Sequence, residues 1–483
     1  MDRTIQPEIQ TLKNFRILPP VRMTLPNGIP LTVINAGEQE VVRIDVLFAG
    51  GRWQQSQKLQ ALFTNRMLRE GTKKYTAATI AEKLDYYGSW LELSSSSEYA
   101  YITVYSLNKY LAKTLEVVES MIKEPLFPEK ELHTILDTNI QQYLVNTSKV
   151  DFLAHRSLLQ SLYGEQHPCG KIVVEEDYHA ITPEVLREFY ERYYHSGNCS
   201  IFLSGKVTED IISRVTDTFG TSFGQHQQQV SRLSFPFTAV PGKRIFTERE
   251  DAMQSAVKMG YTTITRNHPD YLKLRVLMTL FGGYFGSRLM SNIREEKGYT
   301  YGISAGIMFY PDSGLLAIST ETDNEYVEPL IQEVYHEIDR LHQEPVSAEE
   351  LTIVRNYMLG EMCRSYESPF SLSDAWIFIA TSFSGFTFYF DGSAHHINQL
   401  FHNRHSQSGS AYLSGCCVPF PAKGLKDDGE IFFAHANSGI RNLCFYPYIS
   451  FLAAWKFCGY QRYCTTVRCI LNCIAEKINH NFS

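Results

Sequence analysis

The chain has 483 residues, of which 44% are apolar and 20% are charged, and it carries a formal net charge of −7. This length supports two to four domains with full cores, and the composition is that of an ordinary globular protein. The acidic balance argues against a nucleic-acid partner, and no apolar run is long enough to span a membrane. The first residues lack the apolar segment of a secretory signal, so we expect a cytoplasmic chain without disulfides.

Regular patterns in the first half of the chain predict short strands and amphipathic helices. The turn Pro26-Asn27-Gly28 between two β-rich runs predicts a hairpin, and Thr182 followed by Pro183 marks the start of a helix. The predicted strands are 21–25, 29–34, 41–48, 91–93, 99–105 and 199–204. The predicted helices are 60–72, 76–84, 111–123, 129–145, 151–163 and 185–194.

A similar order of elements follows a segment with little periodicity. Residues 224–241 contain Gln, Ser and Pro, and we interpret them as a linker between a domain at 1–223 and a second domain at 242–382. The predicted strands of the second domain are 256–261, 299–309 and 314–319, and its predicted helices are 270–280, 287–295, 326–342 and 348–362. The repeated order indicates a duplicated α+β unit.

The helix predicted over 60–72 has the frame of a metal-binding helix without its ligands. In the inverted zinc-peptidase motif H-x-x-E-H, two His one helical turn apart share a Zn²⁺, and the Glu takes a proton from the bound water. Here Leu62, Asn65 and Arg66 occupy these three positions. Leu62 has no lone pair, Asn65 is not a general base, and Arg66 is a permanent cation that repels Zn²⁺. Taken alone, this is either a plain packing helix or a helix that has lost its chemistry.

Motifs spread over both halves carry a resemblance to a known family. They lie at 25–28, 67–72, 126–128, 162–164, 167–168 and 203–207 in the first half, and at 260–261, 270–271, 281–283, 287–289 and 293–301 in the second. The most specific is Ile-Arg-Glu-Glu-Lys-Gly-Tyr-Thr-Tyr at 293–301. Over about 21–380, the chain resembles the insulinase-like (pitrilysin, M16) zinc peptidases, in the small two-domain branch that includes mitochondrial processing peptidase. This resemblance implies two homologous α+β domains, each a mostly antiparallel sheet packed with helices.

The resemblance also implies a third zinc ligand, a Glu on the helix after the Phe-Pro turn. That position falls at or near Gln141, with Gln142 beside it, and a neutral amide is a poor zinc ligand. No His precedes His133, so the first half cannot rebuild the His pair nearby. We therefore expect no metal and no catalytic residue in this chain, and zinc only in a partner subunit that carries H-x-x-E-H.

The second half keeps two residues that the family uses. Arg294 and Tyr301 match the Arg and Tyr that the family's second domain contributes to a peptide held at the zinc of the first domain. An Arg fork can hold a carbonyl or carboxylate, and a Tyr hydroxyl can donate to a developing oxyanion. Gly282 and Gly283 could let a substrate backbone approach closely. The alternative is that Tyr301 is an ordinary strand residue and Arg294 a solvated charge at a helix end.

The last 101 residues, 383–483, depart from the rest of the chain. They hold 13 charged residues and seven of the ten Cys, and no helical period persists. We interpret them as a tail translated out of frame or replaced. The alternative is an appended Cys-rich module, although no metal-ligand or disulfide spacing emerges.

The sequence thus predicts a non-catalytic, substrate-binding subunit of a heterodimeric M16 zinc metalloendopeptidase. Its partners would be a peptide substrate and an active M16 subunit, with no nucleic acid and no membrane. Three alternatives stay open. The chain could be a structural or binding M16-like protein with no role in proteolysis, an active peptidase with relocated ligands, or a frame-broken product that does not fold.

Overall fold

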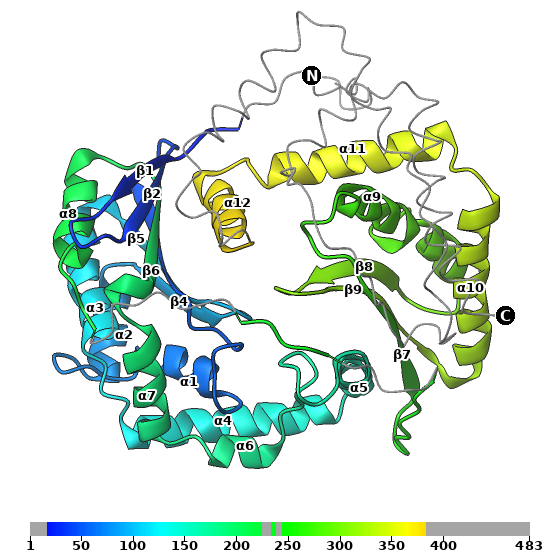
Figure 1. The fold of residues 1–483 in the computed structure, drawn as a ribbon, viewed down its shortest axis with the longest axis horizontal. Coiled ribbons are helices and arrows are strands. Elements are labelled where there is room, and N and C mark those ends of the chain that lie inside the picture. Colours follow the sequence, from blue (N-terminus) through cyan, green and yellow to red (C-terminus); the bar gives the residue numbers. More distant parts are fainter. Residues whose placement is uncertain (1–16, 225–232, 238–243, 383–483) are drawn as a thin grey trace, which may run out of the picture.

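The computed structural model describes residues 17–224, 233–237 and 244–382, and the structural statements below concern these residues. Figure 1 shows two sheets on opposite sides of the molecule, each covered mostly by helices of its own half. The predicted α+β fold with two domains, each with a mostly antiparallel sheet, is confirmed. The predicted tail at 383–483 and most of the predicted linker lie outside the described residues.

The first half builds a six-stranded sheet in the order β1-β2-β6-β3-β5-β4. Its strands are β1 (Val21–Thr24), β2 (Pro30–Asn35), β3 (Val41–Phe48), β4 (Trp90–Ser95), β5 (Ala100–Leu107) and β6 (Cys199–Gly205). Only β2 and β6 run parallel; the other neighbours are antiparallel. The central strand β3 is buried along almost its whole length, because its apolar residues meet helices on both faces of the sheet.

Eight α-helices and two 3₁₀ turns complete the described part of the first half. They are α1 (Gln60–Met67), α2 (Ala77–Tyr86), η1 (Asn108–Tyr110), α3 (Leu111–Lys123), α4 (Glu129–Thr147), α5 (Val150–Tyr163), α6 (Glu175–His179), α7 (Pro183–Tyr193), η2 (Ser196–Asn198) and α8 (Glu209–Phe219). The side chains of Thr76, Thr182 and Thr208 cap three of these helices by accepting a backbone hydrogen bond in the first turn. The helix predicted over 60–72 ends at Met67, earlier than expected, and Gly71 (φ 146°) then turns the chain.

The second half repeats part of this plan with three antiparallel strands in the order β7-β9-β8. Its elements are β7 (Gln254–Thr263), α9 (Tyr271–Gly282), the π-helix η3 (Met290–Glu296), β8 (Ile303–Phe309), β9 (Gly314–Asp323), η4 (Asn324–Tyr326), α10 (Val327–Gln343), α11 (Ala348–Arg364) and α12 (Pro369–Ser382). The order β7-β9-β8 corresponds to β3-β5-β4, and η4 leads into α10 as η1 leads into α3. The described residues of the second half contain no counterpart of β1, β2 or β6.

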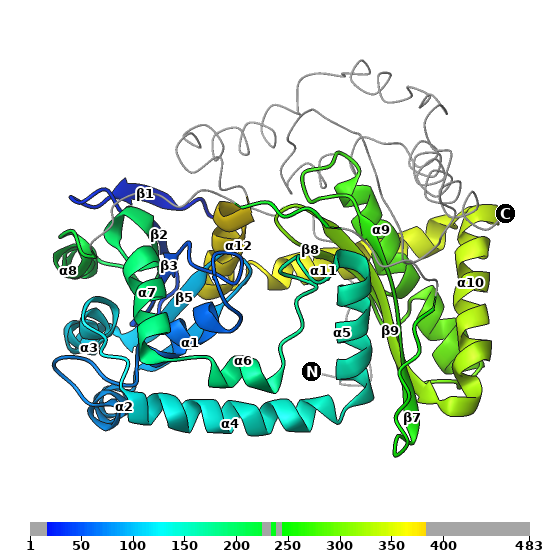
Figure 2. The same cartoon turned by 60° about the horizontal axis from the view of Figure 1, so that its bottom comes forward.

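Each half lends one helix to the sheet of the other. Helix α5 of the first half packs on β7, where Leu158 and Leu162 lie against Gly260. Helix α12 of the second half packs on the first sheet, with Leu372, Trp376 and Ile377 against the apolar residues of β2, β3 and β6. Figures 1 and 2 show α12 beside the strands of the first half and α5 beside those of the second. The two halves are therefore joined by exchanged helices as well as by the chain between them.

A charge network that is buried at Arg43 and Asp45 and exposed at Asp374 fixes α12 on the first sheet. The Arg43 guanidinium donates to the Asp45 carboxylate at 2.9 Å and to the Asp374 carboxylate at 2.5 Å. It also donates to the Phe370 carbonyl oxygen at 3.3 Å, and the Thr103 hydroxyl donates to Asp45 at 2.8 Å. Burial raises the pKa of Asp45, against the opposing effect of the Arg43 charge. Strand β3 is thus tied to a helix that follows it by more than three hundred residues.

No helix in the described part of the chain is both long enough and apolar enough to cross a lipid bilayer.

Candidate functional site

Helix α1 carries the three positions at which the motif H-x-x-E-H would place its chemistry. Its apolar residues Ala61, Phe63 and Met67 are fully buried in the core of the first half. Leu59 begins the helix in the left-handed conformation at φ 70°, which is uncommon for a residue with a side chain. Packing of these apolar residues therefore fixes the position of α1 independently of its polar residues.

Asn65, at the position of the motif's Glu, is a buried structural residue. It is 1% exposed, and its amide donates to the carbonyl oxygens of Ser94 at 2.6 Å and Tyr101 at 3.1 Å. Its side-chain oxygen accepts a hydrogen bond from the Tyr194 hydroxyl at 3.3 Å. A carboxylate cannot make the two donor contacts. Asn65 therefore ties α1 to β4 and β5, and its polar atoms are used within the fold.

The other two positions on α1 are also unsuited to a metal. Leu62 is partly buried and packs against the core. Arg66 is partly buried, and its guanidinium donates to the Asn139 side-chain oxygen on α4 at 2.5 Å. Burial lowers the pKa of Arg66, and the nearby Arg69 acts in the same direction. A guanidinium still remains charged throughout the physiological range.

Asn139 and Gln141 lie differently on α4. Gln141 is exposed on α4, whereas Asn139, two residues earlier, contacts Arg66. Two residues along a helix turn the side chain by about 200° around the axis. Asn139 therefore faces α1 and Gln141 does not, and the assignment of the third ligand position to Gln141 remains a prediction.

Together, these positions do not fit a zinc ion. An aliphatic side chain, a hydrogen-bonded amide, a cation and a second amide replace the His and carboxylate donors that Zn²⁺ requires. Across the described residues, no group of three or more His, Cys, Asp or Glu side chains is arranged to hold a metal ion.

The Arg and Tyr of the second half lie next to each other. Arg294 belongs to the π-helix η3, a rare conformation that is frequent at functional sites. Its Nε donates to the carbonyl oxygen of Tyr301 at 3.0 Å, and its guanidinium stacks on the ring of Phe285 at 4.5 Å. It also forms a long ion pair with Glu295, at 3.8 Å. Arg294 is thus positioned by its neighbours, while part of its fork stays open.

Tyr301 is not the strand residue that the sequence predicts. The strand expected to begin at residue 299 begins at Ile303, and Tyr301 lies before it with 93% of its surface exposed. The backbone around it is held by hydroxyl groups: Thr300 donates to the Glu321 carbonyl at 2.6 Å, and Thr322 donates to the Tyr299 carbonyl at 2.6 Å. A fixed backbone therefore presents an exposed tyrosine ring.

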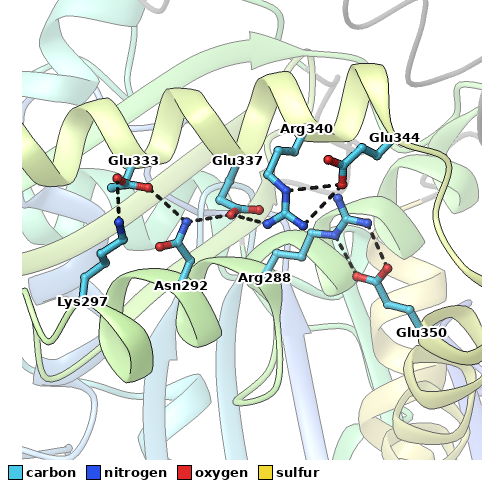
Figure 3. Close-up of polar contacts among 8 residues, drawn as sticks. All are labelled: Arg288, Asn292, Lys297, Glu333, Glu337, Arg340, Glu344 and Glu350. Carbon is cyan, nitrogen blue, oxygen red and sulfur yellow. Dashed lines mark hydrogen bonds and ion pairs between the residues drawn. The ribbon is translucent and has the colours of Figure 1, made fainter.

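A polar network anchors the π-helix to α10 and α11 (Figure 3). The Asn292 amide donates to the fully buried carboxylate of Glu337 at 2.7 Å, and Arg340 donates to the same oxygen at 2.8 Å. Arg288 holds Glu350 with two hydrogen bonds, at 2.8 and 2.9 Å. The further members of the network are Lys297, Glu333 and Glu344. These contacts lie on both sides of Arg294 in the sequence and restrict the movement of the helix that carries it.

The glycines before the π-helix have different surroundings. Gly282 is the last residue of α9 and is buried, and a Cβ atom there would lie 2.5 Å from the Cβ of Ala305 on β8. Close packing of α9 on β8 therefore accounts for Gly282. Gly283 follows it and is exposed. The predicted contact of these glycines with a substrate backbone remains a prediction.

Arg294 and Tyr301, which the sequence pairs by resemblance, lie next to each other, and their role remains a prediction. The sequence did not indicate Phe285 beside Arg294 or Asn139 beside Arg66. Phe285 was passed over as part of a glycine-rich loop, although an exposed aromatic residue between glycines is itself a signal of a contact surface. Asn139 was missed because spacing alone does not give the rotation of a helix. Leu62, Asn65 and Arg66 do share one short helix, as expected.

Comparisons with known proteins agree with this architecture. The family model described as Insulinase (Peptidase family M16) matches residues 32–171, and the model described as Peptidase M16 inactive domain matches residues 180–358. The two matches follow each other in the order of the two halves and together span well over half of the chain.

Relatives and solved structures extend over the same region. An uncharacterized zinc protease YmxG from Bacillus subtilis is 24% identical over 351 residues, which are 72% of this chain and 84% of that protein. A protein named non-peptidase homolog YmxG from Helicobacter pylori is 22% identical over 61% of this chain and 68% of its own length. The crystal structure of a peptidase M16 inactive domain from Pseudomonas fluorescens superposes with a TM-score of 0.63 at 22% identity, covering 71% of this chain and 84% of that one. The fold, the paired family matches and these relatives show that the chain belongs to the M16 peptidase family.

Proposed function

We propose that this chain is a non-catalytic, substrate-binding subunit of a heterodimeric M16 zinc metalloendopeptidase. In this arrangement a partner subunit carries H-x-x-E-H and binds the zinc, and this chain supplies Arg294 and Tyr301 to the peptide. The observation that carries the proposal is the contrast between the two candidate sites. The polar groups on α1 are used inside the fold or unsuited to a metal, whereas Tyr301 is 93% exposed on a fixed backbone.

The chemistry of the pair suits a supporting role in peptide hydrolysis. When a zinc-bound water attacks a peptide carbonyl, negative charge develops on the carbonyl oxygen, and a phenolic hydroxyl can donate a hydrogen bond to it. A guanidinium can hold a second carbonyl or a carboxylate of the same peptide. Neither residue generates a nucleophile, so both depend on a metal held elsewhere.

The test is an assay of peptide hydrolysis with this chain alone, the partner alone and the two mixed. We expect activity only in the mixture. Tyr301→Phe, which removes only the hydroxyl, should lower kcat of the mixture by about 10²–10³-fold, the usual cost of losing one oxyanion donor. The matched control is Tyr86→Phe, another exposed tyrosine on α2, which should leave kcat unchanged. Full activity of the Tyr301→Phe mixture would contradict the assignment.

A second function is a structural or binding M16 protein with no role in proteolysis. The poor fit of α1 to zinc favours it, and one relative carries the name non-peptidase homolog. Arg294→Ala separates the two functions. It should reduce the activity of the mixture if this chain contacts the peptide, and should leave that activity unchanged if the chain is only structural. Metal analysis of the purified chain addresses the remaining alternative, because stoichiometric zinc would require relocated ligands.

A further inference from the structure

Two partly buried arginines of the first half lack the kind of carboxylate partner that Arg43 and Arg288 have. Arg43 pairs with Asp45, Arg288 with Glu350, and a buried cation without such a partner is costly. Arg66 on α1 and Arg156 on α5 are both partly buried. Within the described residues, neither has an Asp or Glu oxygen within 4.0 Å.

The two guanidinium groups both contact residues of α4. The rings of Tyr143 and Tyr178 lie 5.6 Å apart, and Arg156 lies over the Tyr143 ring at 5.8 Å. Burial raises the pKa of the Tyr178 hydroxyl, and the charges of Arg66 and Arg156 both oppose that increase. Asn139, which accepts the hydrogen bond from Arg66, and Tyr143, over which Arg156 lies, are four residues apart on α4 and therefore share one face of that helix.

Most of the donors of these two arginines are not used within the fold. Arg66 makes one hydrogen bond, to the Asn139 amide oxygen, and Arg156 makes one, from Nη2 to the Val173 carbonyl oxygen at 2.9 Å. A guanidinium has five N–H donors. The acidic residue next to Tyr178, Asp177, is already paired with Lys58 at 2.9 Å. The two arginines thus keep hydrogen-bond donors that no described group of the fold uses.

We propose that Arg66 and Arg156 form a binding site for a carboxylate group of a bound peptide. The guanidinium of Arg66 would bind the carboxylate at α1, the helix that has the H-x-x-E-H positions without metal ligands in them. The rings of Tyr143 and Tyr178 would line the approach to this site. The positive charge at α1 would then belong to Arg66 and bind an anion, whereas the zinc ion of an H-x-x-E-H helix activates water. The site rests on the proposed function for the identity of its ligand, and it narrows that ligand to peptides with a free C-terminal or side-chain carboxylate.

The experiment is a fluorescence anisotropy titration of the full chain, without any partner subunit, using a labelled peptide that has one Glu and a free C-terminus. Arg66→Gln and Arg156→Gln should each weaken binding about tenfold to a hundredfold, because a charge-assisted hydrogen bond is lost. Arg69→Gln is the matched control. It lies on the surface just beyond α1, is paired with Glu70 at 3.2 Å, and should leave the affinity unchanged. Equal affinity of the wild-type and Arg66→Gln chains would overturn the site.

Two modified peptides identify the source of the carboxylate. Amidating the C-terminus should weaken binding if the terminal carboxylate is bound, and replacing Glu with Gln should weaken it if the side chain is bound; either result supports the site, and no effect from both contradicts it. Unchanged thermal unfolding of the variants shows that they fold. The titration contains no partner subunit. A negative titration therefore does not affect the hydrolysis test of Tyr301, and a negative hydrolysis test leaves the titration valid.

Discussion

The two halves share a plan of three strands and covering helices, but they use their polar residues in opposite ways. In the first half, Asn65 is 1% exposed and makes all its contacts within the fold. In the second, Tyr301 is 93% exposed, although its backbone is held as firmly. A side chain whose hydrogen bonds are satisfied internally contributes to stability, whereas an exposed side chain on a fixed backbone is available to a ligand. The difference separates a helix whose polar side chain is used within the fold from a segment whose tyrosine is exposed to solvent.

The largest expected loss of stability follows from breaking the contact between the two halves. Arg43→Met leaves the buried Asp45 carboxylate without its cation and releases α12 from β3. Removing one partner of a buried pair typically costs about 3–5 kcal/mol, so urea unfolding should show a loss of that order. The control is Arg214→Met, which removes an exposed ion pair with Asp210 and should change stability by less than about 1 kcal/mol. Similar unfolding midpoints for the two variants would mean that the network does not hold the halves together.

The next effect concerns the helix whose chemistry is absent. Asn65→Asp keeps the shape of the side chain but replaces two donors with acceptors facing the carbonyl oxygens of Ser94 and Tyr101. Repulsion and burial of the charge should destabilise the chain by about 2–4 kcal/mol at pH 7, as measured by urea unfolding. If Asn65→Asp unfolds like the wild type, Asn65 is not the structural link that its contacts indicate.

A smaller loss of stability tests whether Gly282 in the second half is required for packing or for contact with a ligand. Gly282→Ala places a Cβ against Ala305 and should cost about 1–3 kcal/mol through overpacking. Gly306→Ala on β8 is the control, since no atom lies within 4 Å of the added Cβ. Thermal unfolding compares the two variants. Equal melting temperatures would remove the packing explanation and leave substrate contact as the reason for Gly282.

The last prediction leaves the sequence and the fold unchanged. Burial raises the pKa of Cys169 to about 12 from 9.0, and burial also raises the pKa of Cys199. Because the thiolate reacts, alkylation of native Cys169 at pH 8 should be about a thousandfold slower than that of an ordinary thiol and should rise about tenfold per pH unit up to 12. Peptide mapping compares both sites with the partly exposed Cys363 of the second half. Rapid labelling of Cys169 would show that the first half opens.

The sequence predicted elements best where one apolar face decides the structure. The strand 41–48 and the helix 111–123 agree with β3 and α3 at both ends: β3 is buried almost throughout, and α3 buries one apolar face. Helix α8 was missed although Thr208 caps it in the usual way. The strand expected from residue 299 begins later because Thr300 bonds to the β9 backbone through its hydroxyl group.

The site was harder to predict than the fold, for geometric reasons. Local patterns indicate which face of α4 or α5 is apolar, but they do not indicate the sheet or helix that each face meets. The contact between Arg66 and Asn139 depends on the rotation of α4, and the position of Arg156 near Tyr178 depends on how α5 leaves α4. The exchange of α5 and α12 could not be predicted, because an apolar helix fits either sheet equally well by pattern alone.

The exchanged helix α12 has a consequence for how the protein is made. The ion pair between Arg43 and Asp374 spans 331 positions, and the first sheet stays uncovered on one side until α12 has left the ribosome. Domains usually fold one after another during synthesis, whereas contacts between distant residues form slowly. The first half must therefore wait for the second, with Ile34, Leu47 and Phe202 open to chaperones or to aggregation in the meantime. A nascent chain halted before α12 should be far more sensitive to proteases than one released after it.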